Sequence, residues 1–358
     1  MKRVQGVFYG AMVRNVLLWQ YIASLRLLPY TRHLSDVTVC YEGERPICYA
    51  GSSVLVCKVE RDGKPMALRV YRSCRNNLSE IYGERYYPFE LPILGYTDRV
   101  AEYADVVLMD WYDGETLQRV LEQRVGDVEY MRRLSRKFEQ YALWLLDQEW
   151  AHGDIKPDNI IVNGEEIHLI DLDSLYKPSF KSDDCEEIGS PGFQHPMRSR
   201  ENFSKAIDDY PIALIITALA ALSYDASFAE QITSSGKFLI SPLNAILGKE
   251  EWLDRIERLF VERGDARHYR IAQLLRSSHL ALYRLRDYIA MEVGEVRDAS
   301  RLEVDVEEGL WGYKEGDRWI IPPLYDSAFE AENGLCRVVL NGQILWLNDK
   351  GEVVEKEG

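Results

Sequence analysis

Residues 150–162 read WAHGDIKPDNIIV, and this stretch restricts the fold of the chain more than any other. Asp154, Lys156 and Asn159 precede an apolar run, and a second apolar run, EIHLI, leads to Asp171. The spacing predicts a loop between two short strands, which brings these polar side chains to one edge of a cleft. Because a buried core does not need this much polarity, the stretch predicts a site of chemistry.

These four side chains are two carboxylates, an amide and an ammonium group. Phosphoryl transfer needs such a set: a metal ion that neutralises charge, a cation on the moving phosphoryl group and a base near the acceptor hydroxyl. The pattern D-x-K-x-x-N with a later aspartate therefore favours a phosphotransferase over a purely structural loop.

With these residues the chain resembles the eukaryotic-type protein kinases, found also in bacteria, across about residues 36–290. The resemblance implies a two-lobed α+β fold that binds ATP and Mg²⁺ and phosphorylates Ser or Thr of a protein substrate. It implies that Asp154 orients or accepts the proton of the substrate hydroxyl and that Lys156 touches the γ-phosphate. Asn159 and Asp171 would hold the magnesium ion.

Further landmarks follow in the order that the family has. His152 looks like the family's packing histidine and has no catalytic role. Ser190, in GSPGFQHPM, corresponds to the residue that bonds the catalytic Asp and Lys, and Asp208 to the residue that braces the catalytic loop. Aminoglycoside and choline kinases share H-G-D and a later Asp but lack K-P-D-N and this activation segment. A protein acceptor is therefore favoured over a small molecule or a lipid.

The segment VVLMDWYDGETL, residues 106–117, looks like the strand and hinge that meet adenine in the family. The side chain before the hinge would be the gatekeeper, Met109, and the hinge backbone would contact the base. The residues that the resemblance assigns to the nucleotide are Gly51, Val56, Ala67, Arg69, Glu80, Met109, Asp110 and Tyr112.

The nucleotide side departs from the family pattern at two points. The glycine-rich loop is reduced to YAGSSVLVCKV, in which Gly51 survives and Val54 occupies a glycine position, so its backbone can approach phosphates less freely. Arg69, in MALR, stands where the strand-three lysine is expected. An arginine is longer and planar, and it does not simply replace the point charge of a lysine.

The catalytic side departs as well. D-F-G reads Asp171-Leu172-Asp173, Gly153 replaces the arginine of H-R-D, and Met197 replaces the glutamate of A-P-E. Without that arginine, a phosphorylated activation loop lacks its usual partner. These departures keep open a second hypothesis, a pseudokinase or nucleotide-binding scaffold that serves protein interaction.

Hairpin geometry predicts which side chains share the face turned to the nucleotide. Asp62-Gly63 marks a two-residue turn, which pairs Lys58 with Ala67 and Val56 with Arg69. Because side chains alternate along strands, these four point to one face. Arg69 is expected to pair with a helix carboxylate, Glu80 or in second place Glu84. Lys58 is a second cation on that face.

Composition excludes one class of partner. The chain has 358 residues, with 43 Lys and Arg against 58 Asp and Glu, and a net charge of −15. So acidic a surface repels nucleic-acid backbones, and we expect no nucleic-acid partner.

The location of the protein is predicted to be cytoplasmic. The six cysteines show no C-x-x-C pair, which suits reduced thiols and makes a disulfide framework improbable. No signal-peptide pattern opens the sequence, and the apolar run 211–222 is too short to span a bilayer, so it is expected to be a buried helix. Residues 11–28 form an amphipathic, basic helix; packing on the following domain is favoured over membrane contact.

The character of the chain changes again after about residue 295. Setting GLWGYKEG over GQILWLNDKG matches Trp311 with Ile344, a period of 344 − 311 = 33 residues, and the segment resembles the bacterial WG β-repeat. Fewer than two repeats are present. Because such repeats bury their faces against neighbours, we expect this piece to dock on the helices before it.

These patterns predict four parts. Residues 1–35 form a helical extension, 36–115 a small β-rich lobe, 116–295 a larger helical lobe and 300–358 a WG-type β module.

Overall fold

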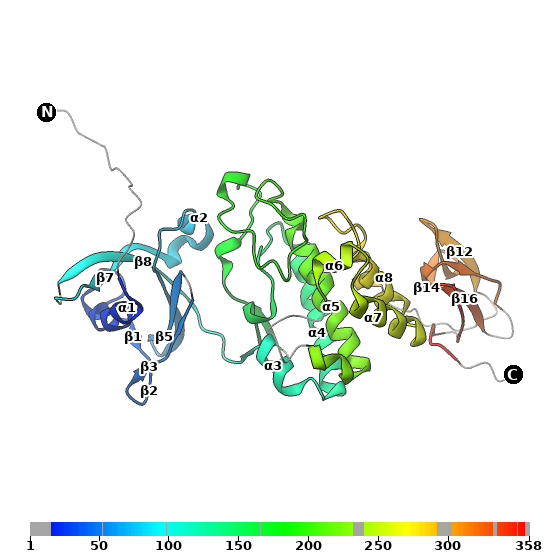
Figure 1. The fold of residues 1–358 in the computed structure, drawn as a ribbon, viewed down its shortest axis with the longest axis horizontal. Helices are drawn as coiled ribbons and strands as arrows, with labels where there is room; N and C mark the ends of the chain where they lie inside the picture. Colours follow the sequence, from blue (N-terminus) through cyan, green and yellow to red (C-terminus); the bar gives the residue numbers. More distant parts are fainter. Residues whose placement is uncertain are drawn as a thin grey trace. The chain divides into compact units, whose positions relative to one another are not determined.

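The computed structural model describes residues 16–51, 53–97, 99–164, 166–231, 240–291, 302–331, 335–348 and 350–354. The chain forms two compact units, Met1–Tyr112 and Asp113–Gly358 (Figure 1). Both contain helices and antiparallel strands, which agrees with the predicted α+β class.

The first unit is built on a six-stranded antiparallel sheet with the order β1-β5-β6-β8-β7, and β4 also pairs with β5. Two short helices precede the sheet, and a short helix α2 with the turn η2 lies between β6 and β7. The elements are α1 (Leu18–Ser24), η1 (Leu25–Tyr30), β1 (Thr38–Val39), β2 (Tyr41–Glu42), β3 (Arg45–Pro46), β4 (Cys48–Ala50), β5 (Val54–Arg61), β6 (Lys64–Tyr71), α2 (Leu78–Tyr82), η2 (Gly83–Arg85), β7 (Tyr86–Leu94) and β8 (Val100–Asp110).

The β5–β6 hairpin has the predicted register. Asp62 and Gly63 turn the chain with φ angles of 53° and 72°, the left-handed values that a two-residue hairpin turn requires. Opposite each other lie Val56 and Arg69, and likewise Lys58 and Ala67, so the prediction is confirmed.

One face of this sheet is covered by the N-terminal helices. Its alternate residues, among them Leu55, Val59 and Leu68, form a core with Tyr21 and Leu25 of the helices. Figure 1 shows α1 against the sheet. The described part of the predicted helix over 11–28 therefore packs on the domain that follows, as expected; residues 11–15 lie outside the described residues.

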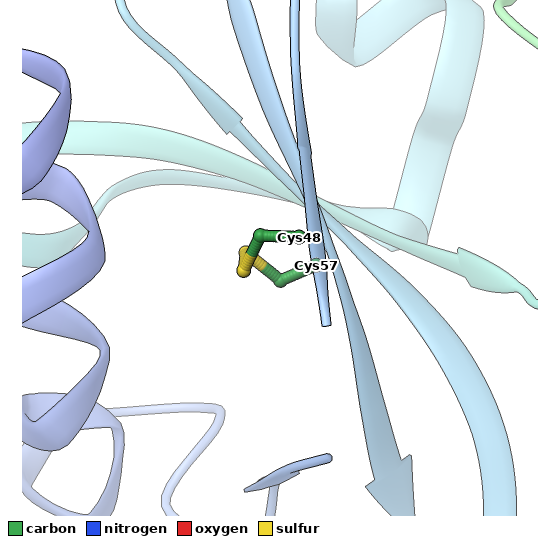
Figure 2. Close-up of a disulfide and its surroundings, with 2 residues drawn as sticks. All are labelled: Cys48 and Cys57. Atoms are coloured by element: carbon green, nitrogen blue, oxygen red, sulfur yellow. A yellow bond between two sulfur atoms is a disulfide. The ribbon is translucent and has the colours of Figure 1, made fainter. Parts of the chain in front are cut away.

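The expectation of six reduced thiols is wrong at one pair. Cys48 of β4 and Cys57 of β5 are joined in a disulfide (Figure 2). The register sets them directly opposite each other with 4.1 Å between their Cα atoms, the close spacing of a pair that exchanges no backbone hydrogen bonds. This pairing could not be read from cysteine spacing, and it weakens the thiol argument for a reducing cytoplasm.

The second unit begins with helices and one small sheet. Its first elements are β9 (Glu115–Thr116), α3 (Leu117–Arg124), α4 (Val128–Asp147), η3 (Pro157–Asn159), β10 (Ile160–Asn163), β11 (Glu166–Leu169), η4 (Leu172–Ser174), η5 (Ser182–Asp184), η6 (Lys205–Asp208) and α5 (Asp209–Tyr224). Then follow η7 (Ala226–Gln231), α6 (Pro242–Ile246), α7 (Glu251–Glu262), α8 (Ala266–Leu274) and α9 (Leu285–Ala290).

Helices α4 and α5 form the centre of this unit and lie side by side (Figure 1). Asp127 caps the N-terminus of α4 with a side chain that accepts a 2.9 Å hydrogen bond from the Tyr130 amide, and the apolar residues of the helix recur at helical spacing. The continuous helix Lys205–Tyr224 is long and apolar enough to cross a membrane, but 89% of its apolar window is buried inside the protein. It is the buried helix that the sequence predicted.

In the described residues after α9, six strands form two antiparallel three-stranded sheets. They are β12 (Glu303–Glu307), β13 (Leu310–Glu315), β14 (Arg318–Tyr325), β15 (Ser327–Ala328), β16 (Cys336–Leu340) and β17 (Gln343–Leu347).

These strands pack on the helices before them. The buried Arg270 of α8 donates hydrogen bonds of 2.7 Å to the Leu324 carbonyl and to Asp326, and apolar residues of both parts share one core. This agrees with the expectation that the segment docks on the helical lobe.

Candidate functional site

The β10–β11 hairpin positions the quoted loop. Ile160 pairs with Leu169, and the Ile170 amide donates a 2.9 Å hydrogen bond to the Asn159 carbonyl. Asn159 and Asp171 are therefore held at the same end of the hairpin, as the sequence spacing predicted.

Asp154 is the centre of a polar network. Its Oδ2 accepts hydrogen bonds from Lys156 Nζ (2.8 Å) and Asn159 Nδ2 (3.1 Å), and its Oδ1 accepts one from the Ser190 amide (2.7 Å). Lys156 also donates to Ser190 Oγ at 2.8 Å. The contacts expected of Ser190 with Asp154 and Lys156 are thus confirmed, and three of the predicted site residues meet.

The buried Asp208 fixes the backbone of the loop that precedes Asp154. Asp208 accepts hydrogen bonds from the amides of His152 (2.5 Å) and Gly153 (2.9 Å), as predicted. Burial raises the pKa of Asp208, although these amides and nearby cations favour the carboxylate. His152 is fully buried, donates from Nε2 to the Ile170 carbonyl at 2.9 Å and accepts the Asp154 amide at Nδ1, so it acts as a structural residue.

Close backbone packing explains the glycine at position 153. Gly153 has a φ of 83°, and a Cβ there would overlap the Ser174 carbonyl oxygen. A Cβ at Gly189, with a φ of 76°, would in turn overlap the Gly153 carbonyl. Gln194 Nε2 donates to the same carbonyl at 3.2 Å. An arginine at position 153, as in the H-R-D pattern, therefore does not fit this packing.

The segment that follows Ser190 is anchored by a residue that the sequence analysis did not single out. His195 donates from Nε2 to the Ser277 carbonyl at 3.1 Å, accepts the Met197 amide at Nδ1 and packs edge-on against Tyr210. Burial lowers the pKa of His195 and favours this neutral form. The side chain of Met197, which stands where A-P-E has its glutamate, is 61% exposed.

The two residues predicted to hold magnesium, Asn159 and Asp171, both carry oxygen donors. Asn159 uses its Nδ2 for the Asp154 carbonyl (2.9 Å) and carboxylate, which leaves Oδ1 outside this network. Asp171 has a φ of 67°, an uncommon value for a residue with a side chain. In the part of the chain that the structure describes, no three His, Cys, Asp or Glu side chains could hold a metal. Magnesium commonly takes one or two protein ligands together with phosphates and water.

The residues predicted to contact adenine belong to the first unit. Ala67 lies opposite both Lys58 and Met109, and Arg69 opposite both Val56 and Val107. Because paired residues share a face, these side chains lie on the face that the N-terminal helices do not cover. Lys58 Nζ lies 5.0 Å from the centre of the Trp111 ring.

The remaining predicted residues occupy different positions in that unit. Gly51 donates from its amide to the Val54 carbonyl at 2.8 Å and closes the turn between β4 and β5. Glu80 is exposed in the five-residue helix α2 and accepts a hydrogen bond from Ser79 at 2.6 Å. Lys64 (2.8 Å) and Arg85 (3.2 Å) bind the Asp110 carboxylate, and the Lys64 hydrogen bond lowers its pKa. Tyr112 ends the unit.

Comparison with known proteins gives a weak relationship to kinases. No family model matches the chain. A probable serine/threonine-protein kinase of Dictyostelium discoideum, mkcE, is 23% identical over 160 residues, which is 44% of this chain and 22% of that protein. The match thus spans about a fifth of the relative, and it suggests a kinase-like relationship.

Proposed function

We propose that the chain is a Mg·ATP-dependent phosphotransferase with the two-lobed fold of the protein kinases, acting on Ser or Thr of a protein. The observation that carries the proposal is the Asp154 network, in which a lysine, an amide group and a backbone amide converge on one carboxylate. A scaffold that only binds partners does not need this arrangement.

Hydrogen-bond capacity suggests how Asp154 acts. Each carboxylate oxygen can accept two hydrogen bonds. Oδ2 accepts two, from Lys156 and Asn159, whereas Oδ1 accepts one, from Ser190. Oδ1 therefore retains acceptor capacity, and the substrate hydroxyl would donate its proton there.

The charged groups around Asp154 have separate roles in the proposal. Lys156 would neutralise charge on the transferred phosphoryl group, and Ser190 would fix the position of the Lys156 ammonium group. Asn159, through Oδ1, and Asp171 would hold magnesium, which supplies charge neutralisation on the phosphates when bound. On the first unit, Val56, Ala67 and Met109 would contact adenine, and Arg69 would pair with Glu80 and the α- and β-phosphates.

A nucleotide-binding scaffold is the second candidate, and one observation favours it. Arg69 is 6% exposed and lies 5.7 Å from the centre of the Tyr71 ring, so its guanidinium is held by neighbours instead of standing as a mobile ammonium. Such a scaffold would bind ATP without transferring phosphate. The C-terminal strands, proposed as a WG-type module, would then serve the interaction.

The test is transfer from labelled γ-phosphate ATP with magnesium, using the full chain and casein or myelin basic protein as acceptors. Asp154→Asn keeps the shape of the side chain and is expected to lower transfer by about 10²- to 10⁴-fold. Phosphoamino-acid analysis of the acceptor tests the Ser/Thr assignment. Transfer that survives Asp154→Asn would contradict the proposal, and ATP binding without any transfer would favour the scaffold.

Magnesium dependence is tested separately by thermal shift. ATP is expected to stabilise the wild type more with magnesium than without it, and Asp171→Ala is expected to remove that difference. An equal shift with and without magnesium would show that the ion is not held here.

A further inference from the structure

A cavity of about 460 Å³ lies within the second unit, away from Asp154. One stripe of α4, including Arg136, Glu139 and Leu143, forms one wall, and residues of α9 and β14, including Ile289 and Leu324, form others. Pockets that bind small molecules have this size. The cavity exists because the C-terminal strands dock on the helices.

The acidic groups of the cavity are already satisfied. Glu139 accepts from His268 Nε2 (3.0 Å) and Ser135 (3.3 Å) at one oxygen and from Arg267 (2.7 Å) at the other. Asp265 accepts from His268 Nδ1 at 2.6 Å and from Tyr224 at 2.8 Å. Burial opposes charge on His268, but the two carboxylates outweigh it and raise its pKa to about 9. The carboxylates are neutralised by protein groups.

The arginines of the cavity retain donor capacity. Arg267 uses Nη1 for Glu139 and for the Ile289 carbonyl (3.1 Å), and within the described ranges its Nε donates no hydrogen bond. Its side chain is 26% exposed. Arg136 is exposed one turn before Glu139 and forms no ion pair with any residue that the structure describes. A guanidinium has five N–H donors, so both arginines can donate hydrogen bonds to an anionic ligand.

We propose that this cavity binds a small organic anion with an apolar body. A carboxylate or phosphate group would lie on Arg136 and Arg267, and a short aliphatic chain would contact Leu143, Ile289 and Leu324. The balance of charge favours an anion over a cation. Arg267 and His268 neutralise the carboxylates of Glu139 and Asp265, and the positive charge of Arg136 is left without an acidic partner in the described residues. This site is separate from the Asp154 network and does not depend on the proposed phosphotransfer.

The test uses octanoate and octyl phosphate as probes and the full chain. Each is expected to raise the melting temperature in a saturable way, and titration calorimetry gives the affinity. Octanol lacks the charge, whereas acetate and inorganic phosphate lack the apolar body; all three are expected to bind at least about tenfold more weakly. If octanol binds as well as octanoate, or acetate and phosphate bind as well as the long-chain probes, the proposal is wrong.

Variants locate the binding. Arg136→Glu is expected to weaken octanoate binding by about tenfold or more, and Arg136→Lys to retain most of it. Ala290→Trp, at the cavity wall, is expected to block binding of every probe. Arg119→Glu on α3 makes the same charge reversal away from the cavity and is expected to leave binding unchanged. The proposal would be overturned if the wild type bound none of the probes. It would also be overturned if Arg136→Glu and Ala290→Trp bound octanoate as tightly as the wild type.

Discussion

Lys156 and Ser190, far apart in the chain, meet through a 2.8 Å hydrogen bond from Nζ to Oγ. The same lysine binds Asp154, so the hydroxyl of Ser190 is one of two groups that determine where the ammonium group lies. The segment that contains Ser190 therefore orients Lys156 by direct contact.

Removing that hydroxyl should affect turnover more than substrate binding. Ser190→Ala is expected to lower kcat by about tenfold with little change in the KM for ATP, because one hydrogen bond to a charged group is lost. Ser190→Thr keeps the hydroxyl and is expected to stay near the wild type. Steady-state kinetics check this, and an unchanged kcat in Ser190→Ala would show that Lys156 does not need this partner.

A side chain at position 153 should destabilise the second unit. Gly153→Ala requires a left-handed backbone and overlaps the Ser174 carbonyl, so we expect a loss of about 3 kcal/mol or more in urea denaturation. Gly248→Ala is the matched control: its φ is 66°, and no atom lies within 4 Å of an added Cβ. It is expected to cost about 1 kcal/mol. Equal losses in the two variants would contradict the packing argument.

The buried His268 should make stability depend on pH. Burial alone would lower its pKa, but Asp265 and Glu139 raise it from 6.5 to about 9. Because the folded-state pKa is the higher one, the stabilisation is fully present below pH 6.5 and is lost as the pH rises to about 9. The loss of this stabilisation is expected to be on the order of 3 kcal/mol.

Denaturation at several pH values compares the wild type with His268→Gln. The variant is expected to be less stable at pH 6 and to lose the decline between about pH 6.5 and 9. A wild-type decline that persists unchanged in His268→Gln would assign the dependence to another group.

Arg69 should be the cation that the nucleotide needs. Arg69→Ala is expected to weaken ATP binding and transfer most, and Arg69→Lys to retain or raise activity, because a lysine supplies a compact charge at that position. Lys58 lies over Trp111, and Lys58→Ala is expected to have the smaller effect. A wild-type-like Arg69→Ala together with an inactive Lys58→Ala would show that the neighbouring strand supplies the charge.

Local patterns in the sequence determined several parts of the fold. The Asp62-Gly63 turn and the alternation of the strands around it predicted the partners of Val56 and Lys58, because a two-residue turn permits one register. The apolar run at 211–222 predicted the buried helix α5 for a similarly local reason. The composition and spacing of 150–162 also predicted the group of residues around Asp154.

Only the tertiary structure decided the contacts between residues distant in sequence. Cys48 and Cys57 pair because β4 lies beside β5, and His195 contacts Ser277 because the segment after Ser190 packs against the connection between α8 and α9. Glu139 and His268 meet across 129 positions, and the cavity beside them forms only when the C-terminal strands dock. Such contacts depend on how complete faces pack, and no spacing within one element of the sequence records that.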